Sequence, residues 1–296
     1  MTDTSPLAVW TWAPVPLALA AVLAVLYVLG VRRVAARGGR WSRGRSVVFL
    51  GVGVPALVLA ACWWPGARAH EVFAAYVTMV MALALVVPAV LVAGAPVRLG
   101  REALAGSSTG RAWDATFDSR PVRWATHPLV TPLLMLALPC LVVFTPLLLA
   151  SLQSAPVLAG MQVALVLLGM LAVLALVHGQ VPEHGVPHAV AAFVAFFELV
   201  LDAIPGIVLY LSTTLVAGGW YAVHGAPGGA DWAQGDQQTG GAILWGVGEA
   251  IDVPFLIVVV ALWMRADAEE ARRMDALLDA QDAARRAAAQ DGPDLG

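Results

Sequence analysis

The chain alternates between long apolar runs and shorter polar segments. Seven apolar runs can be recognised, at 8–30, 46–64, 71–97, 128–151, 157–177, 189–217 and 241–264. Each is long enough for a helix to cross a bilayer, which takes about 20 residues. The pattern therefore predicts an all-α membrane protein. We expect a seven-transmembrane-helix bundle formed by residues 1–264 and a charged helical tail at 265–296.

The composition supports this class. Hydrophobic residues make up 60% of the 296 positions and charged residues 12%, whereas a soluble domain has about 25% charged residues. The sequence contains no lysine, so all 17 basic residues are arginine. A retinal-binding seven-helix protein needs a lysine amine for its Schiff base. That class is therefore excluded.

The arginines are unevenly distributed between the two sides of the predicted bundle. Six lie in the segment 31–45, five in 98–127 and five after residue 264, and these three segments share one side if there are seven spans. Only Arg68 falls on the other side. Basic residues accumulate on the cytoplasmic side of membrane proteins. The distribution predicts an outside N-terminus and a cytoplasmic C-terminus.

Four acidic residues lie inside the last two predicted spans. Each pair shares one face of its helix and is followed by a proline, which frees backbone carbonyl oxygens nearby. Because a charge in the bilayer is costly, such acids mark a cation or proton site, or are protonated and hydrogen-bonded between helices. The candidate site residues are Glu198, Asp202, Glu249 and Asp252.

A second candidate site lies on the outer side, near the start of the third span and in the polar segment 218–240, which we expect to form an exposed loop. Imidazole and thioether groups suit copper, although methionines in an apolar run usually pack in the core. The residues considered as metal ligands here are His70, Met81, His224 and Asp236.

Three stretches together resemble the CtaG-type family of cytochrome c oxidase assembly factors. They are PAVLVAGAPVRLGREAL at 88–104, THPLV at 126–130 and DQQTGGAILW at 236–245. The resemblance covers most of the chain from about residue 46 onward. It implies a multi-pass protein of the bacterial cytoplasmic (inner) membrane that helps to mature a haem-copper oxidase, with copper or another divalent cation as its cofactor.

The resemblance also shows where this chain departs from the family. The family carries histidines in its third, fourth and fifth spans, and these positions fall on Tyr76, Val80, Phe144 and Gln162 here, while Met81 retains the family residue. Imidazoles are suitable copper ligands. The chain is therefore expected to be a divergent member that lacks the membrane histidines.

These observations lead to one functional prediction and two alternatives. The resemblance implies an assembly factor that aids copper delivery to, or maturation of, a haem-copper oxidase. A cation- or proton-handling protein that uses the intramembrane carboxylates is the first alternative, and a structural accessory subunit of a respiratory complex is the second. The oligomeric state stays open.

Partners and reaction class follow from the remaining motifs. The motif Asp236-Gln237-Gln238 is the expected partner or loop motif on the outer side, with an oxidase subunit as the partner. Membrane lipid accounts for the arginine-rich segments without nucleic acid. No phosphate-binding loop or HExxH motif is present, so we expect no enzymatic activity.

Overall fold

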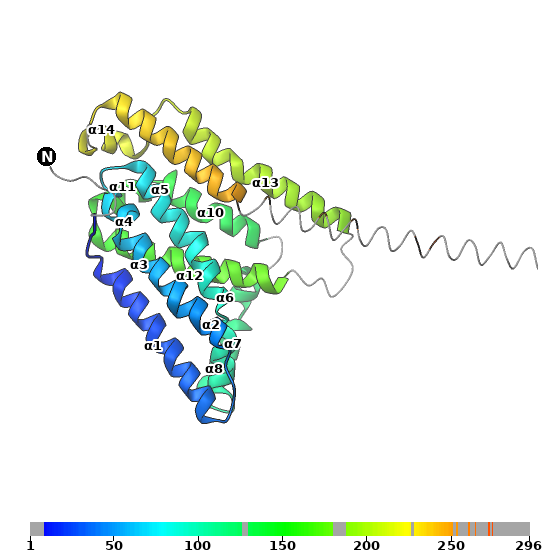
Figure 1. Ribbon diagram of the computed structural model, residues 1–296. Coiled ribbons are helices and arrows are strands. Elements are labelled where there is room, and N and C mark those ends of the chain that lie inside the picture. The colour runs from blue at the N-terminus through cyan, green and yellow to red at the C-terminus, as the bar shows by residue number, and fades with distance from the viewer. Residues whose placement is uncertain are drawn as a thin grey trace, which may run out of the picture. The chain divides into compact units, whose positions relative to one another are not determined.

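The computed structural model describes residues 9–125, 130–179, 188–225 and 228–250, and five single positions after them. Within these ranges all regular structure is helical, and no strand occurs (Figure 1). Contacts divide the chain into two units. The first comprises residues 1–182 and 202–248, and the second 183–201 and 249–296.

The helices of the first half begin with α1 (Pro14–Ala36). A continuous second segment follows, formed by α2 (Arg43–Ser46), η2 (Val47–Gly53) and α3 (Val54–Cys62), with α4 (Trp64–Arg68) after a bend. The third segment consists of α5 (Phe73–Met81), η3 (Ala82–Val86) and α6 (Val87–Ala93). Three short helices come next, α7 (Pro96–Leu104), α8 (Ser108–Phe117) and α9 (Arg120–Ala125).

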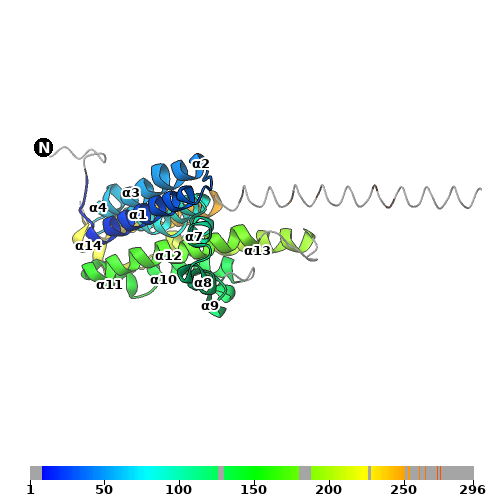
Figure 2. The same ribbon diagram turned by 90° about the horizontal axis from the view of Figure 1, so that it is seen from below.

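The second half contains α10 (Thr131–Val143), α11 (Leu147–Gln153), α12 (Ala155–Gly179) and α13 (His188–Leu211). Short helices η4 (Val216–Gly219) and α14 (Trp220–His224) precede a helix at 230–250. In the first unit, α1 and α3 lie on one side and α10 and α12 on the other (Figure 2).

The predicted spans are confirmed in part. Among the residues that the structure describes, five helices are long and apolar enough to cross a membrane, and a sixth crossing results if α10 and α11, bent by 55°, form one span. The structure describes the predicted span 241–264 continuously only as far as residue 250. The count of seven spans and the orientation of the termini therefore remain predictions.

The two π-helical segments have a common cause. Both η2 and η3 end just before a helix that carries proline in its first turn, Pro55 in α3 and Pro88 in α6. Proline lacks a backbone N–H, and its ring crowds the carbonyl of the preceding turn. The helix relieves this conflict by widening locally to π-type turns.

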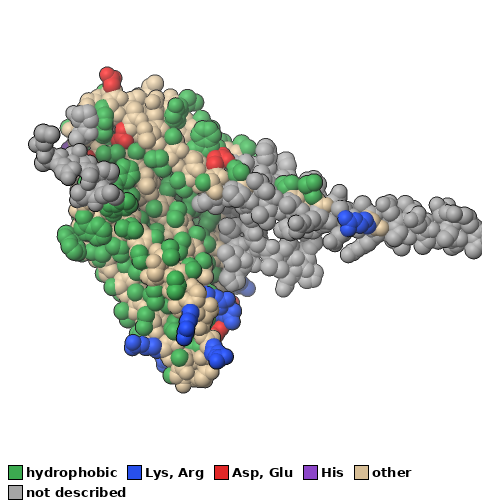
Figure 3. All heavy atoms as spheres, in the orientation of Figure 1, with side chains coloured by type: hydrophobic (Ala, Val, Ile, Leu, Met, Phe, Trp, Pro, Cys, Tyr) green, Lys and Arg blue, Asp and Glu red, His purple; other side chains and the backbone are tan. Residues whose placement is uncertain are grey.

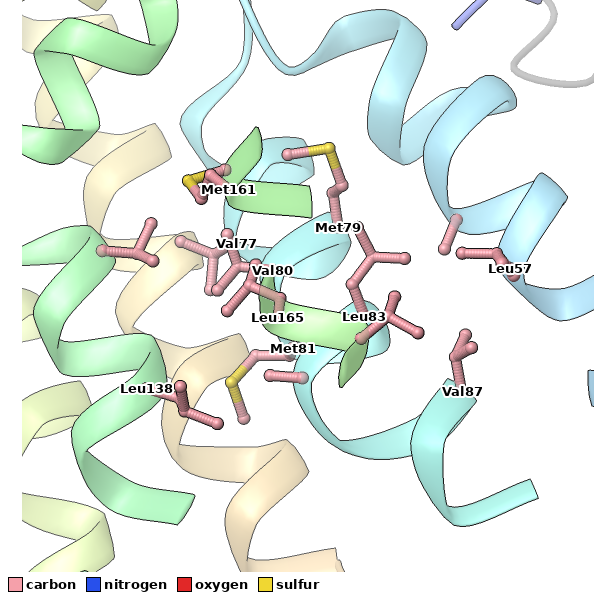
Figure 4. Packing of buried hydrophobic residues seen from close by; sticks show 14 of the residues in the cluster. Leu57, Val77, Met79, Val80, Met81, Leu83, Val87, Leu138, Met161 and Leu165 are labelled. Atoms are coloured by element: carbon pink, nitrogen blue, oxygen red, sulfur yellow. The ribbon is translucent and has the colours of Figure 1, made fainter. Parts of the chain in front are cut away.

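The third segment forms the centre of the first unit. Of the most apolar stretch of this segment, 67% is buried inside the protein, compared with 17% for the corresponding stretch of α1. Its buried side chains interlock with those of α3, α10 and α12 (Figure 4), and Val77, Val80 and Leu83 are fully buried. Polar groups placed on this segment are therefore removed from both lipid and water.

The polar segment 98–127, which separates the third and fourth predicted spans, is helical over most of its described residues. Gly94 ends α6, Ala95 adopts a left-handed conformation with φ of 55°, and Pro96 begins α7. This GAPV turn redirects the chain sharply, and Ser107 then caps α8 by accepting a hydrogen bond from Gly110 N at 3.0 Å. Arginines of α1, α2 and α7 gather at this end of the unit (Figure 3).

Candidate functional site

Asp236 lies in the helix at 230–250 and caps another helix. Its carboxylate accepts hydrogen bonds from the backbone N–H of Phe73 at 2.6 Å and of Ala74 at 3.1 Å, both in the first turn of α5. The residue before α5, Val72, has no side chain that could do this. Unsatisfied N–H groups at a helix start need an acceptor. Asp236 therefore anchors the central segment to the helix at 230–250.

Gln237 makes a second connection at the same level. Its Oε1 accepts a hydrogen bond from Val216 N at 2.8 Å, and its Nε2 donates to Thr214 O at 3.1 Å. The side chain is 1% exposed. A side-chain amide can both donate and accept, so it can provide hydrogen-bond partners for backbone N–H and C=O groups that lie beyond the end of a helix. Gln237 thus holds the turn that follows α13.

The expected exposed loop at 218–240 is not supported by these contacts. Its second half belongs to a helix, and Asp236 and Gln237 are buried. The motif that we assigned to a partner therefore makes intramolecular hydrogen bonds with its first two residues. Gln238 is partly exposed.

The two candidate histidines lie beside the same aromatic residue. Trp220 Nε1 donates to the carbonyl oxygen of His70 at 3.0 Å, and the ring of His224 stacks on Trp220 with centroids 3.7 Å apart. Tyr221 adds a hydrogen bond to Ala69 O at 2.9 Å. These contacts attach α14 to the connection between α4 and α5.

The structure does not bring the proposed outer ligands together as one cluster. The Met81 side chain is buried in the hydrophobic core, 3% exposed, and the Asp236 carboxylate is engaged by α5. Among the described residues, no three His, Cys, Asp or Glu side chains are placed to hold a metal ion. The hypothesis of a metal site at His70, Met81, His224 and Asp236 gains no support from this geometry.

A different set of polar contacts involves Tyr76 and Gln162, two of the four positions to which the resemblance assigns histidine. Tyr76, on α5, is fully buried, and its hydroxyl lies 2.7 Å from Ser151 Oγ and donates to Met161 Sδ at 3.3 Å. Ser151 also donates to Leu148 O at 2.7 Å. The phenol is thereby satisfied between α5, α11 and α12.

Gln162 of α12 makes a similar contact with a different methionine. Its Nε2 donates to Met79 Sδ at 3.2 Å, and the residue is 4% exposed. Tyr76 and Gln162 therefore each donate a hydrogen bond to a thioether sulfur. Met79 and Met161 both extend into the packed interior (Figure 4). Sequence reasoning missed Met161 and Ser151, because an isolated Met or Ser in an apolar run is indistinguishable from packing.

The intramembrane acids are described incompletely. Asp202, on α13, is partly buried and close enough to Cys140 of α10 for an electrostatic interaction. Glu249 is partly buried near the end of the helix at 230–250. Glu198 lies on α13, but its side chain, like the whole of Asp252, falls outside the described residues. The carboxylate site stays a prediction.

Burial affects the chemistry of Asp236, which precedes the predicted span 241–264. Removal of its carboxyl group from water raises its pKa above the usual aspartate value, and the hydrogen bonds from Phe73 and Ala74 oppose this only in part. The group therefore holds its proton to a higher pH than a solvated aspartate.

Comparison with known proteins places these features in a family. An uncharacterised protein of Mycobacterium leprae (strain TN) is 30% identical over 284 residues, which cover 90% of this chain and 41% of that protein. Proteins of Mycobacterium bovis and Mycobacterium tuberculosis are each 28% identical over 289 residues, which cover 91% of this chain and 41% of each of those proteins. The chain thus spans about two fifths of the length of these relatives.

No solved structure matches this chain. The family model described as cytochrome c oxidase caa3 assembly factor (Caa3_CtaG) matches residues 25–266, which include the GAPV turn, the Tyr76 cluster and the motif at 236–238. The chain belongs to the cytochrome c oxidase caa3 assembly factor family.

Proposed function

We propose that this chain is a multi-pass membrane assembly factor for a haem-copper oxidase. The observation that carries the proposal is the family match over residues 25–266, which covers almost the whole described bundle. The structure is consistent with it, because GAPV and the first two residues of the motif at 236–238 take part in structural contacts of the bundle. The chain then acts as a non-enzymatic helper of oxidase subunits in a bacterial cytoplasmic membrane.

Copper, as cargo rather than as a resident cofactor, requires a donor set. The described residues do not reproduce a histidine set, since Tyr76 and Gln162 occupy two of those positions. The soft donors beside them are the thioethers of Met79 and Met161. Thioether sulfur suits Cu(I). We propose that copper handling, as the finer part of this function, uses these two sulfur atoms.

A deletion strain tests the assembly role. We expect loss of the gene to lower cytochrome c oxidase activity and the wild-type chain to restore it. Growth at low and high copper distinguishes the assembly role from copper handling. Recovery of activity by added copper supports copper handling, whereas a defect that persists at high copper supports assembly without copper delivery. Normal oxidase activity in the deletion strain at both copper levels would refute the assembly role.

The thioether proposal has its own control within the chain. Met79→Leu together with Met161→Leu removes both sulfur atoms at nearly constant volume, and Met81→Leu removes a sulfur from the same buried segment. We expect the double variant to restore oxidase poorly at low copper and well at high copper, and Met81→Leu to behave like wild type. Equal complementation by both variants at low copper would contradict a role for the two thioethers.

A further inference from the structure

Two cavities lie side by side at the arginine-rich end of the first unit. One, of about 450 Å³, is lined by Arg45, Arg98 and Arg101, and the other, of about 520 Å³, is lined mainly by apolar side chains of α1, α7, α8 and α12. They share four lining residues, Val92, Pro96, Val97 and Leu174. The GAPV turn therefore separates a cationic cavity from an apolar one, and both have sizes typical of ligand sites.

The cationic cavity carries an excess of positive charge. Arg98 pairs with Glu102 at 2.8 Å and Arg101 with Asp114 at 3.2 Å. Arg45 lies over the ring of Trp41 at 5.4 Å and has no carboxylate partner among the described residues. The segments 31–45 and 98–118 together hold nine arginines and three acids. An anionic group would therefore be favoured here.

The apolar cavity is formed by side chains that a bilayer would cover. Leu26 and Leu29 of α1 and Leu167 of α12 line it and are about half exposed in the isolated chain. Trp113 of α8 also lines it, with its ring against Gly100, and its Nε1 is buried without a hydrogen-bond acceptor among the described residues. A buried donor of this kind is costly unless the occupant provides an acceptor.

The geometry points to a specific site for one anionic phospholipid at this end of the bundle. Its phosphate lies in the cationic cavity near Arg45 and Arg98, and an acyl chain follows the apolar cavity along α1 and α12. The indole ring of Trp113 borders the acyl chain. Basic pockets at the ends of membrane helices bind lipid headgroups in this way. The inference stands independently of the proposed function, because it uses neither oxidase nor copper.

The test titrates the delipidated full chain in detergent with dioleoylphosphatidylglycerol and with zwitterionic dioleoylphosphatidylcholine, and follows bound lipid by native mass spectrometry. We expect tighter binding of the anionic lipid. Arg45→Gln with Arg98→Gln should weaken it about twenty-five-fold, since each arginine near an anionic lipid contributes about fivefold. The control, Arg40→Gln with Arg43→Gln, makes the same charge change outside both cavities. It should weaken binding much less.

The apolar half of the site needs a separate variant. Leu26→Trp fills the cavity from α1, and Val25→Trp places the same bulk on the neighbouring exposed residue, which does not line it. We expect only Leu26→Trp to lower lipid binding. Equal affinity for the two lipids, equal losses in the paired variants, or equally tight binding of glycerol 1-phosphate without acyl chains would each overturn the proposal.

Discussion

The carboxylate of Asp236 and the backbone N–H of Phe73 form a 2.6 Å hydrogen bond across 163 residues of sequence. This contact places the start of the central segment against the helix at 230–250. The bond to Ala74 N at 3.1 Å belongs to the same cap. The motif at 236–238, which opens the last of the resembling stretches, therefore contacts the start of the third predicted span.

Loss of this cap should destabilise the protein. Asp236→Ala leaves two N–H groups of α5 without their acceptor, and each buried unsatisfied group costs about 1–3 kcal/mol. We expect a clearly lower midpoint of thermal unfolding in detergent. Asp231→Ala, at an exposed aspartate of the same helix, is the control and should change the midpoint little. Equal effects of the two substitutions would show that the cap contributes nothing.

The raised pKa of Asp236 predicts a pH dependence of a definite sign. Because burial raises the pKa of this carboxyl in the folded state, the folded protein binds a proton that the unfolded chain has already released. Stability then falls as the pH rises from about 4, the ordinary aspartate value, through the folded pKa. We expect the stability of wild type relative to Asp236→Asn to decline from acid towards neutral pH. A relative stability that rises with pH would show that the pKa is lowered instead.

Gly241 allows close contact between two helices. A Cβ atom there would lie 2.7 Å from Gly206 O and from Tyr210 N, both backbone atoms of α13 that cannot rotate away. Overpacking of this kind costs about 1–3 kcal/mol, so Gly241→Ala should lower the unfolding midpoint. Gly246→Ala is the matched control in the same helix, with nothing within 4 Å of the added atom. It should be neutral or stabilising, as alanine favours a helix over glycine. Comparable losses in both variants would argue against the close contact.

Restoring imidazoles should create a stronger copper site. Tyr76 contacts Met161 and Gln162 contacts Met79, and all four are buried, so Tyr76→His with Gln162→His would place a nitrogen donor beside each of the two sulfurs. We expect this variant to bind Cu(I) more tightly than wild type in a competition titration. The control is Tyr76→Phe with Gln162→Leu, which lacks new donors. Equal affinity of the two double variants would show that these positions do not converge on one ion.

Hydropathy was sufficient to predict the helical class and most of the crossings, since a helix needs only a run of apolar residues to be recognised. It could not show that segment 98–127 folds into α7, α8 and α9, because arginines and small residues there give the composition of a linker. Leu99 and Ala103 of α7 are buried, and only the folded structure shows that α1 packs against this helix.

The candidate sites were predicted less well, for a physical reason. The sequence marks Asp236 as a candidate metal ligand and partner residue, but a carboxylate beside an apolar run is equally compatible with a helix cap. Its acceptor role depends on Phe73, which no local pattern connects to it. From the sequence, Tyr76 is only a position at which the resemblance predicts histidine. Its hydrogen bond to Ser151 requires the packing of α5 against α11.

The central claim is that this chain is needed to assemble a haem-copper oxidase. The most direct measurement is the amount of assembled oxidase per membrane protein, from reduced-minus-oxidised spectra, in a deletion strain and in the same strain carrying the wild-type gene. We predict a marked loss of the oxidase signal in the deletion strain and its return on complementation, with the oxidase transcripts unchanged. An unchanged amount of fully metallated oxidase in the deletion strain would contradict the claim.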